Sequence, residues 1–313
     1  MNKMSFVEFK NEIVEKILDF LPESFNGSEV SLNVVTKPND VSLTGLTIRK
    51  AGSRVAPTIY LEEYYSQIES GDNIGVVMRR IADVRMAHEI EDIDFESFFN
   101  YENCKDKILP RLYGYEMNNQ LIEHRAYTRI GDFIVIYSVD LGPSDEGRMS
   151  VPVDNSILER WNISIEELHN VAVKNQHNVS KGTFMGMSQM MRKIMVPEIL
   201  EDMDCEDDSL SEMLLPEEDE KMFVISNTRG INGASMILDE EFMNSVCDVV
   251  GDSFYILPSS IHEVLAVKDE ELMDVMDMAA MVYEINRMQV SPEERLSDHV
   301  YRYTRDAGIT RAA

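Results

Sequence analysis

The chain has 313 residues, enough for one large core or two domains, and 44% of them are hydrophobic, as in folded globular proteins. Its 57 acidic residues outnumber the 29 basic ones, so the formal net charge is −28. A field of that sign repels phosphate backbones and anionic lipids, which argues against general binding to nucleic acid and against docking on a membrane. The negative charge has three possible explanations: it keeps the protein soluble, it attracts a basic protein partner, or it mimics nucleic acid.

The cysteines and the hydrophobic runs predict a reduced, cytoplasmic protein. Cys104, Cys205 and Cys247 lie far apart and form no CxxC pair, which excludes a zinc knuckle and argues against a disulfide framework. Charged residues interrupt the first ten positions before an apolar stretch forms, unlike a signal peptide. No run of about 18 apolar residues occurs. We therefore expect no membrane association, no cofactor and no metal.

The first part of the chain predicts a helix, three strands and two helices. Hydrophobic residues recur at helical spacing within 6–20, with Ser5 as the N-cap and Glu8 completing a capping box. Strands are expected at 29–37, 41–50 and 57–61, and helices at 62–69 and 73–88. Pro38-Asn-Asp between the first two strands is a hairpin signal.

A comparable order of elements recurs in the middle of the chain. Strands are expected at 124–129, 133–141 and 148–153, followed by helices at 154–161 and 164–178. Gly131 lies in a tight turn between the first two of these strands, and Ser164 begins a second capping box. We interpret residues 1–197 as an N-terminal α+β region, with two αβββαα-like units at 1–115 and 116–197 as one reading of it.

An acidic stretch follows this region. Residues 198–220 contain 12 acidic and no basic side chains, and such a block repels itself and favours an extended linker or loop. A dock for a basic partner and a mimic of nucleic acid remain alternatives. Asp204, Glu206 and Asp208 fit the first positions of a calcium loop, but the glycine and glutamate that an EF-hand needs later are missing.

The remaining residues, 221–313, predict a C-terminal ββαββα unit. Strands are expected at 222–226, 234–238, 253–257 and 261–268, helices at 239–250 and 270–287, and a frayed tail at 305–313. Hairpin signals recur along the chain without a sustained βαβ alternation. The fold class predicted is therefore α+β, with small, mainly antiparallel sheets each covered by helices.

Two His-bearing segments near the C-terminus are the candidate site. They are Ser259-Ser260-Ile-His262-Glu263 and Asp298-His299-Val-Tyr301-Arg-Tyr303. If the protein is a hydrolase-like enzyme, His262 and His299 are acid/base candidates, oriented by Glu263 or Asp298, with Ser260 as the nucleophile. Ser259, Tyr301 and Tyr303 are candidates for binding. That enzyme needs the two segments to converge; otherwise 258–260 is a plain hairpin turn with His262 hydrogen-bonded at its edge.

Familiar catalytic motifs are missing. His88-Glu89 and His262-Glu263 lack the second histidine of a zinc peptidase, and Lys181-Gly182 does not complete a phosphate loop. Pro258-Ser-Ser lacks the glycines of a nucleophile elbow. We therefore interpret the chain as an interaction or binding protein whose protein partner is unidentified. The hydrolase-like enzyme and the acidic mimic of nucleic acid are the alternatives.

The chain resembles an uncharacterised family of bacterial proteins, a domain of unknown function common in anaerobic Firmicutes. The resemblance rests on the N-terminal helix with Phe residues, on Leu43-Thr-Gly-Leu46, and on the segments 256–264 and 296–303. Residues 138–142 and 161–168 are similar to another uncharacterised, bacillus-type family. Neither resemblance implies an activity, a substrate or catalytic residues.

Overall fold

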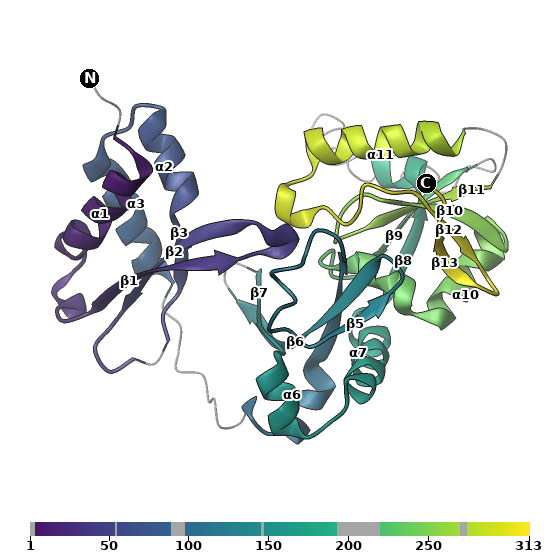
Figure 1. The fold of residues 1–313 in the computed structure, drawn as a ribbon, viewed down its shortest axis with the longest axis horizontal. Helices are drawn as coiled ribbons and strands as arrows, with labels where there is room; N and C mark the ends of the chain where they lie inside the picture. Colours follow the sequence, from purple (N-terminus) through teal and green to yellow (C-terminus); the bar gives the residue numbers. More distant parts are fainter. Residues whose placement is uncertain (1–3, 54, 89–97, 145–146, 193–219, 270–273) are drawn as a thin grey trace, which may run out of the picture. The chain divides into compact units, whose positions relative to one another are not determined.

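The computed structural model describes residues 4–53, 55–88, 98–144, 147–192, 220–269 and 274–313 (Figure 1). They form two compact units. Unit 1 comprises Met1–Lys37 and Val41–Phe98, and unit 2 comprises Pro38–Asp40 and Phe99–Ala313. Every strand pair in the described residues is antiparallel, and helices accompany the sheets in both units, which confirms the predicted α+β fold.

Unit 1 has the predicted order of one helix, three strands and two helices. Its elements are α1 (Phe6–Lys16), η1 (Ile17–Phe20), η2 (Glu23–Phe25), β1 (Glu29–Thr36), β2 (Ser42–Arg49), β3 (Thr58–Tyr60), α2 (Leu61–Glu69) and α3 (Ile74–Ala87). The capping box predicted at Ser5 and Glu8 begins α1. Phe9 and Ile13 point from α1 into the core, where they join buried side chains of β2 and α3. Helix and sheet therefore share one hydrophobic core.

Unit 2 contains two antiparallel sheets. In the first, β6 (Phe133–Ser144) pairs with β4 (Ile108–Gly114), β5 (Tyr127–Ile130) and β7 (Gly147–Pro152). The second has the order β13-β12-β10-β11-β9-β8. Its strands are β8 (Gly182–Gly186), β9 (Met222–Asn227), β10 (Ser253–Pro258), β11 (Val264–Lys268), β12 (Tyr301–Thr304) and β13 (Gly308–Arg311).

Helices pack on both sheets of unit 2. The helices of unit 2 in the described residues are η3 (Pro38–Asp40), α5 (Tyr101–Cys104), η4 (Lys105–Lys107), α6 (Asn155–Trp161), α7 (Ile165–Val179), η5 (Gly233–Leu238), α10 (Glu240–Val250), α11 (Val275–Gln289) and η6 (Pro292–Glu294). Met278 and Val282 of α11 pack on Leu257 of β10 and on Val300, which immediately precedes β12. The two sheets meet where the Phe133 ring of β6 packs against the Tyr301 ring of β12, with the ring centroids 4.6 Å apart.

The turn Pro38–Asp40 joins β1 to β2 in sequence but belongs to unit 2. Asn39 and Asp40 have φ of 60° and 54°, left-handed values that Asn and Asp tolerate better than most residues. Asn39 N–H donates to the buried Asn118 at 2.7 Å. Asn118 Nδ2 donates in turn to Asn39 Oδ1 at 2.9 Å. Further hydrogen bonds of the turn run from Asn39 Nδ2 to the carbonyl oxygens of Pro292 and Arg295, and from the N–H groups of Gln120 and Leu121 to Asp40.

Four segments differ from the prediction. Residues 234–238, expected as a strand, form η5, because Asn232 takes a left-handed φ and Gly233 packs tightly against the neighbouring backbone. The expected frayed tail contains β13, which pairs with β12 and completes one edge of the sheet. Strands β4 and β8 were not expected, since neither shows the strict alternation of a half-buried strand.

The acidic stretch 198–220 lies outside the described residues, apart from Glu220. The linker, and the domain boundary predicted within it, therefore stay predictions. The strands that flank it in sequence, β8 and β9, pair with each other in the six-stranded sheet. Within the described part of the chain, no helix has the length and apolar character needed to cross a bilayer. Cys104 and Cys247 are buried, and Cys205 lies outside the described residues.

Candidate functional site

The two His-bearing segments adopt the same local turn. In Ser260-Ile-His262 and in Ser297-Asp-His299, the histidine backbone N–H donates to the serine hydroxyl two residues earlier, at 3.0 and 3.1 Å. A serine hydroxyl used in this way stabilises a short turn outside any sheet ladder. Each imidazole therefore lies on a loop immediately before a strand, β11 or β12.

His262 has partners at both ring nitrogens. Nδ1 accepts a hydrogen bond from the Asn232 N–H at 3.1 Å, so the proton of the neutral ring lies on Nε2, 3.3 Å from a Glu294 carboxylate oxygen. The His262 carbonyl oxygen accepts from the Ser226 hydroxyl at 2.8 Å. The loop packs so closely on Gly233 that a Cβ there would lie 2.4 Å from this oxygen. These contacts fasten the β10–β11 loop to η5 and η6.

The neighbours of His262 complete a hairpin loop. Ser260 is 8% exposed, and its N–H donates to the Glu263 carbonyl oxygen at 3.2 Å, while Ser259 is half-buried in the same turn. Within the described residues, no hydrogen bond or ion pair joins this loop to Asp298 or His299. The structure thus places the two halves of the candidate hydrolase site in separate clusters.

Asp298, His299 and Tyr301 line a pocket of unit 2 with a volume of about 290 Å³. The end of β4, the β5–β6 turn, α11 and the loop before β12 form its walls. The other lining residues are Gly114, Tyr115, Glu116, Met117, Asp132, Tyr283 and Ser297. Below we call it the acidic tyrosine pocket. Gly114 lets β4 approach this loop, because a Cβ would lie 2.6 Å from the Leu296 carbonyl oxygen.

Two carboxylates and an arginine lie together at one side of the acidic tyrosine pocket. The Oδ2 atom of Asp132 is buried and accepts no hydrogen bond from any described residue. Nη1 of Arg311, on β13, lies 3.6 Å from this atom and 4.0 Å from a Glu116 carboxylate oxygen. Nη2 of Arg311 donates to His299 Nδ1 at 2.8 Å. The chain's own guanidinium therefore contacts this side of the pocket.

Asp298 is fixed at another side of the pocket. It accepts a hydrogen bond from Nδ2 of Asn286 at 3.1 Å and forms an ion pair with Arg287 at 3.4 Å. Asn286 is only 1% exposed, and its amide also donates to the Ser297 carbonyl oxygen at 2.8 Å. The carboxylate of Asp298 is thus held by α11 and does not turn freely.

Tyrosines provide the apolar part of the pocket. Tyr301 is 2% exposed, and its hydroxyl lies 2.9 Å from that of Ser297. Burial raises the pKa of Tyr301 to about 12, so this phenol stays neutral. Tyr115 and Tyr283 each carry a guanidinium over the ring, Arg129 at 3.7 Å and Arg287 at 3.9 Å from the centroid. Cation–π contacts of this kind show that the rings accept cations.

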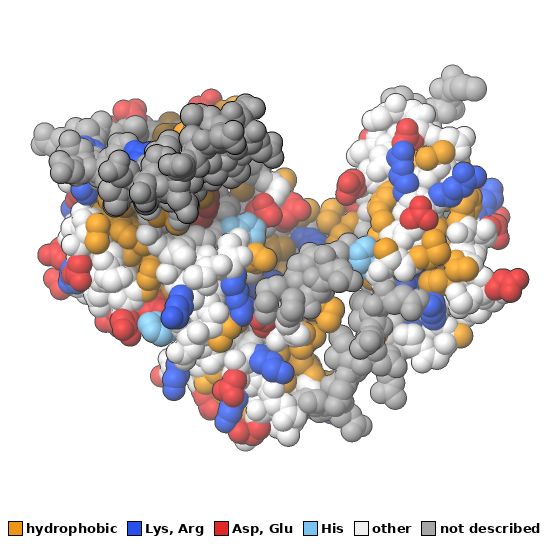
Figure 2. All heavy atoms as spheres, turned by 180° about the vertical axis from the view of Figure 1, so that it is seen from behind, with side chains coloured by type: hydrophobic (Ala, Val, Ile, Leu, Met, Phe, Trp, Pro, Cys, Tyr) orange, Lys and Arg blue, Asp and Glu red, His pale blue; other side chains and the backbone are white. Residues whose placement is uncertain are grey.

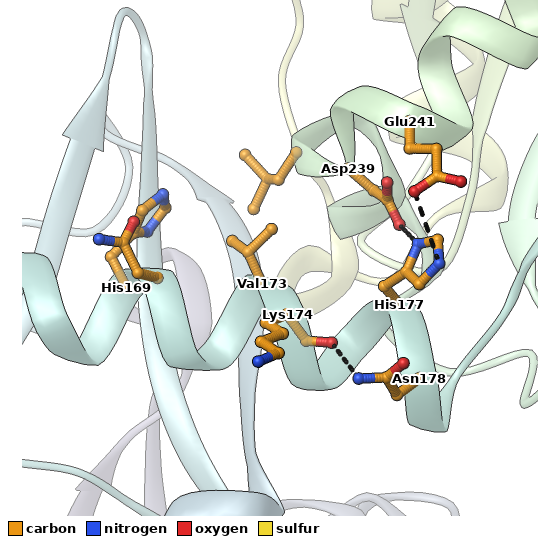
Figure 3. Close-up of a pocket in the computed structure, with 9 residues that line it drawn as sticks. His169, Val173, Lys174, His177, Asn178, Asp239 and Glu241 are labelled. Carbon is orange, nitrogen blue, oxygen red and sulfur yellow. Dashed lines mark hydrogen bonds and ion pairs between the residues drawn. The ribbon is translucent and has the colours of Figure 1, made fainter.

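A second pocket, of about 440 Å³, lies between α7 and the start of α10 (Figure 3). Figure 3 shows the His177 ring, in the last turn of α7, turned toward Asp239 and Glu241. Nδ1 of His177 lies 2.8 Å from Asp239, whose second oxygen caps α10 by accepting from Phe242 N–H at 3.0 Å. The hydrogen bond and the charge of Asp239 raise the pKa of His177 above its usual value. This ion pair joins α7 to α10.

His169 lies two turns earlier on α7 and lines the same pocket. Its Nδ1 is 2.9 Å from the hydroxyl of the buried Tyr137, and burial lowers the pKa of His169. The two histidines of one helix therefore have pKa values shifted in opposite directions. Among the described lining residues there is no Ser, Thr or Cys that His177 could activate as a nucleophile. The arrangement fits a structural ion pair better than a triad.

The predicted site residues thus fall into three places. Asp298, His299 and Tyr301 share the acidic tyrosine pocket, and Ser259–Glu263 form the β10–β11 loop. Tyr303, which is 7% exposed, stacks on the Phe254 ring and lines a third, mainly apolar pocket. The described residues contain no group of three or more His, Cys, Asp or Glu side chains arranged to hold a metal ion.

Sequence reasoning missed several pocket residues. Glu116 and Tyr115 follow β4, a strand that the sequence pattern did not predict, and Arg311 lies in the expected tail. The sequence did contain a feature that could have indicated Asp132, since this residue follows the glycine of a predicted tight turn. The same holds for Asp239, because an Asp at the start of a predicted helix indicates an N-cap.

Comparison with known proteins identifies the family and no activity. No curated protein and no solved structure gave a significant match to the chain. A family model covers residues 6–305, which include residues of both units and every residue that lines the acidic tyrosine pocket. The predicted resemblance to an uncharacterised family is confirmed by this match. The chain belongs to DUF5688, a family of unknown function.

Proposed function

We propose that the protein is a cytoplasmic interaction protein whose acidic tyrosine pocket binds a cationic side chain of a basic partner protein. The observation that carries this proposal is the Asp132 Oδ2 atom, buried beside tyrosine rings and without a hydrogen-bond donor among the described residues. A carboxylate oxygen removed from water is costly unless a cation or a donor compensates it. The Arg311 guanidinium, 3.6 Å from this oxygen, compensates it without a hydrogen bond, and a partner's ammonium or guanidinium group that donates directly would compensate it more fully.

The size and lining of the pocket support a side chain rather than a cofactor. Its volume of about 290 Å³ is at or below the range of pockets for drug-sized ligands, roughly 300–1,000 Å³. One long side chain fits such a space, with its apolar stem against Tyr301 and Met117 and its charge beside Asp132. Aromatic rings and carboxylates together form the usual surroundings of a bound cation.

The charge of the whole chain supports the same kind of partner. A net charge of −28 attracts basic proteins and increases their association rate at low salt. Figure 2 shows acidic and basic side chains interspersed over the face that it draws. A local pocket is therefore a better source of specificity than this mixed surface. The acidic mimic of nucleic acid remains a separate proposal for residues 198–220.

A titration with short peptides tests the proposal. Isothermal calorimetry would compare acetylated Gly-Gly-Arg-Gly-Gly amide with its lysine version and with the version that carries neutral citrulline. We expect binding of the charged peptides, loss of binding by at least about tenfold for citrulline, and a similar loss in Asp132→Asn. The affinity should also fall as salt rises.

The matched control is Glu166→Gln, which removes an exposed carboxylate of α7 outside the pocket. This variant should bind the arginine peptide as the parent does, apart from a small effect of net charge. Equal binding of the citrulline and arginine peptides, or an Asp132→Asn protein that binds normally, would refute a cation site in this pocket.

A further inference from the structure

Arg311 contacts the acidic tyrosine pocket in the way that a partner's arginine would. The residue ends β13, the edge strand of the six-stranded sheet, and its side chain is 44% exposed. One nitrogen donates to His299 Nδ1 at 2.8 Å, while the other lies 3.6 Å from Asp132 and 4.0 Å from Glu116. All three partners line the pocket. The guanidinium thus uses the groups that a bound cation would use.

The ion pair between Arg311 and Asp132 is weak enough to be replaced, whereas the 2.8 Å hydrogen bond to His299 has to be exchanged for one from the ligand. The 3.6 Å separation from Asp132 Oδ2 is too long for a hydrogen bond, and this oxygen has no other donor among the described residues. Exposed ion pairs contribute little to stability, because solvent screens them and the long side chains lose entropy. A partner that donates directly to Asp132 would form a better contact than Arg311 does.

We infer that Arg311 is an internal competitor at the cation site and that an arginine of the partner displaces it. The inference rests on the proposed function and adds the partner's chemistry and a means of control. His299 Nδ1 and the Asp132 carboxylate lie within reach of one guanidinium in this structure. A planar fork with several N–H donors matches two separate acceptors, whereas an ammonium is a compact point charge. Arginine is therefore preferred over lysine.

Arg311 could support the pocket or compete for it, and the two roles predict opposite effects of its removal on ligand binding. If Arg311 only supports the pocket by orienting His299, its removal weakens ligand binding. If it competes, its removal strengthens binding, because the ligand no longer has to displace a cation. The side chain is exposed and its strand pairs through the backbone, so a substitution there leaves the sheet in place.

The test compares three variants with the same acetylated Gly-Gly-Arg-Gly-Gly amide. Arg311→Gln should bind it about two- to tenfold more tightly than the parent, the range expected for loss of a weak exposed pair. Arg311→Lys keeps the charge and should lie between the two. Arg302→Gln removes the same charge from β12, where Arg302 pairs with Asp269, and controls for the change in net charge. It should differ from the parent by less than Arg311→Gln does.

The outcomes separate the two proposals. If the parent binds the peptide and Asp132→Asn does not, but Arg311→Gln binds equally or more weakly, the competitor is refuted and the cation pocket stands. If Arg302→Gln gains as much as Arg311→Gln, general electrostatics explains the gain and the competitor is again refuted. If neither the parent nor Arg311→Gln binds the charged peptides, the proposed function itself fails.

Discussion

His177 and His169 lie on the same helix, yet the fold favours the charged form of one imidazole and the neutral form of the other. His177 is half-exposed and bonded to the buried Asp239 carboxylate, which favours its charged form. His169 is half-buried beside the Tyr137 hydroxyl, and desolvation favours its neutral form. The difference comes from the partner that the fold supplies, which lies 62 residues away for His177 and 32 for His169. No local pattern around either histidine encodes it.

The opposite shifts predict opposite effects of pH on stability. The pKa of His177 is raised in the folded state, so its contribution is fully present below about pH 6.5 and is lost as pH rises through the folded pKa. His177→Gln should therefore lower the free energy of unfolding at pH 5.5, by less than about 1 kcal/mol for so exposed a pair, and change it little at pH 9.

His169→Gln is the matched comparison. The folded pKa of His169 is lowered, so the stability linked to its neutral form is present above about pH 6.5 and is lost as pH falls through the folded pKa. Urea unfolding of both variants and the parent across pH 5–9 measures the two profiles. If the two substitutions have the same pH dependence, the assigned directions of the shifts are wrong.

Elements with a periodic pattern or a clear cap could be predicted, and those held by long-range contacts could not. The capping residues Ser5 and Ser164 and the hairpin at Pro38 correctly indicated α1, α7 and the β1–β2 pair. η5 was mistaken for a strand because Ala234, Met236 and Leu238 alternate with other residues as strand residues do. Its helical turn depends on contacts of Gly233 with residues far away in sequence.

The candidate site could be predicted only in part, because local sequence patterns indicate one of its walls and long-range contacts supply the others. The segment 298–303 was singled out because polar residues adjoin an apolar run; Asp298, His299 and Tyr301 do line one pocket, whereas Tyr303 lines another. The opposite walls come from β4, the β5–β6 turn and α11. Nothing in sequence spacing relates Glu116 or Asp132 to His299, since β6 and β12 meet only through tertiary packing.

The contact between η5 and the β10–β11 loop gives a prediction about how these two elements hold each other in place. In Gly233→Ala the new Cβ would lie 2.4 Å from both the His262 carbonyl oxygen and the Ser226 hydroxyl, so the loop must move. We expect the free energy of unfolding to fall by about 1–3 kcal/mol, as for overpacked sites. Amide exchange in residues 259–263 should become faster, as measured by mass spectrometry. Unchanged exchange in this loop would show that the contact is not tight.

The whole molecule consists of two units, and one short turn changes how their stability should be tested. Asn39 belongs to unit 2, where its amide donates to the carbonyl oxygens of Pro292 and Arg295 at 2.7 Å and accepts from Asn118 at 2.9 Å. Asn39→Gly keeps the left-handed backbone and removes only these side-chain bonds. We expect it to destabilise unit 2 by about 1–3 kcal/mol, since Asn118 is fully buried and loses a partner.

Asn39→Ala is the comparison variant for this turn. Alanine loses the same hydrogen bonds and also bears the cost of a φ of 60°, roughly 1–2 kcal/mol. It should therefore be less stable than Asn39→Gly. Hydrogen exchange of the full chain would locate the loss, which we expect at residues 118–121 and 292–295. Protection lost only in unit 1 would contradict the assignment of this turn.

The acidic stretch carries a separate prediction for the molecule as a whole. If residues 198–220 form a solvated linker, as we predict, neutralising Asp204, Glu206, Asp207 and Asp208 to Asn or Gln should change stability by no more than about 0.5 kcal/mol. Binding of native partners in pull-downs should also persist. A variant that keeps its fold but loses a partner would identify the stretch as a docking surface.

The hydrogen bonds of Asn39 also bear on how the protein is made. Two of them, to Pro292 and Arg295, join residues 253 and 256 positions apart in the chain, so neither can form before the ribosome has synthesised residues 292–295. At about 5–20 residues per second, a delay of tens of seconds or less separates the turn from these two partners. Long-range closure of this kind slows folding, so we expect the contact between this turn and residues 292–295 to form late.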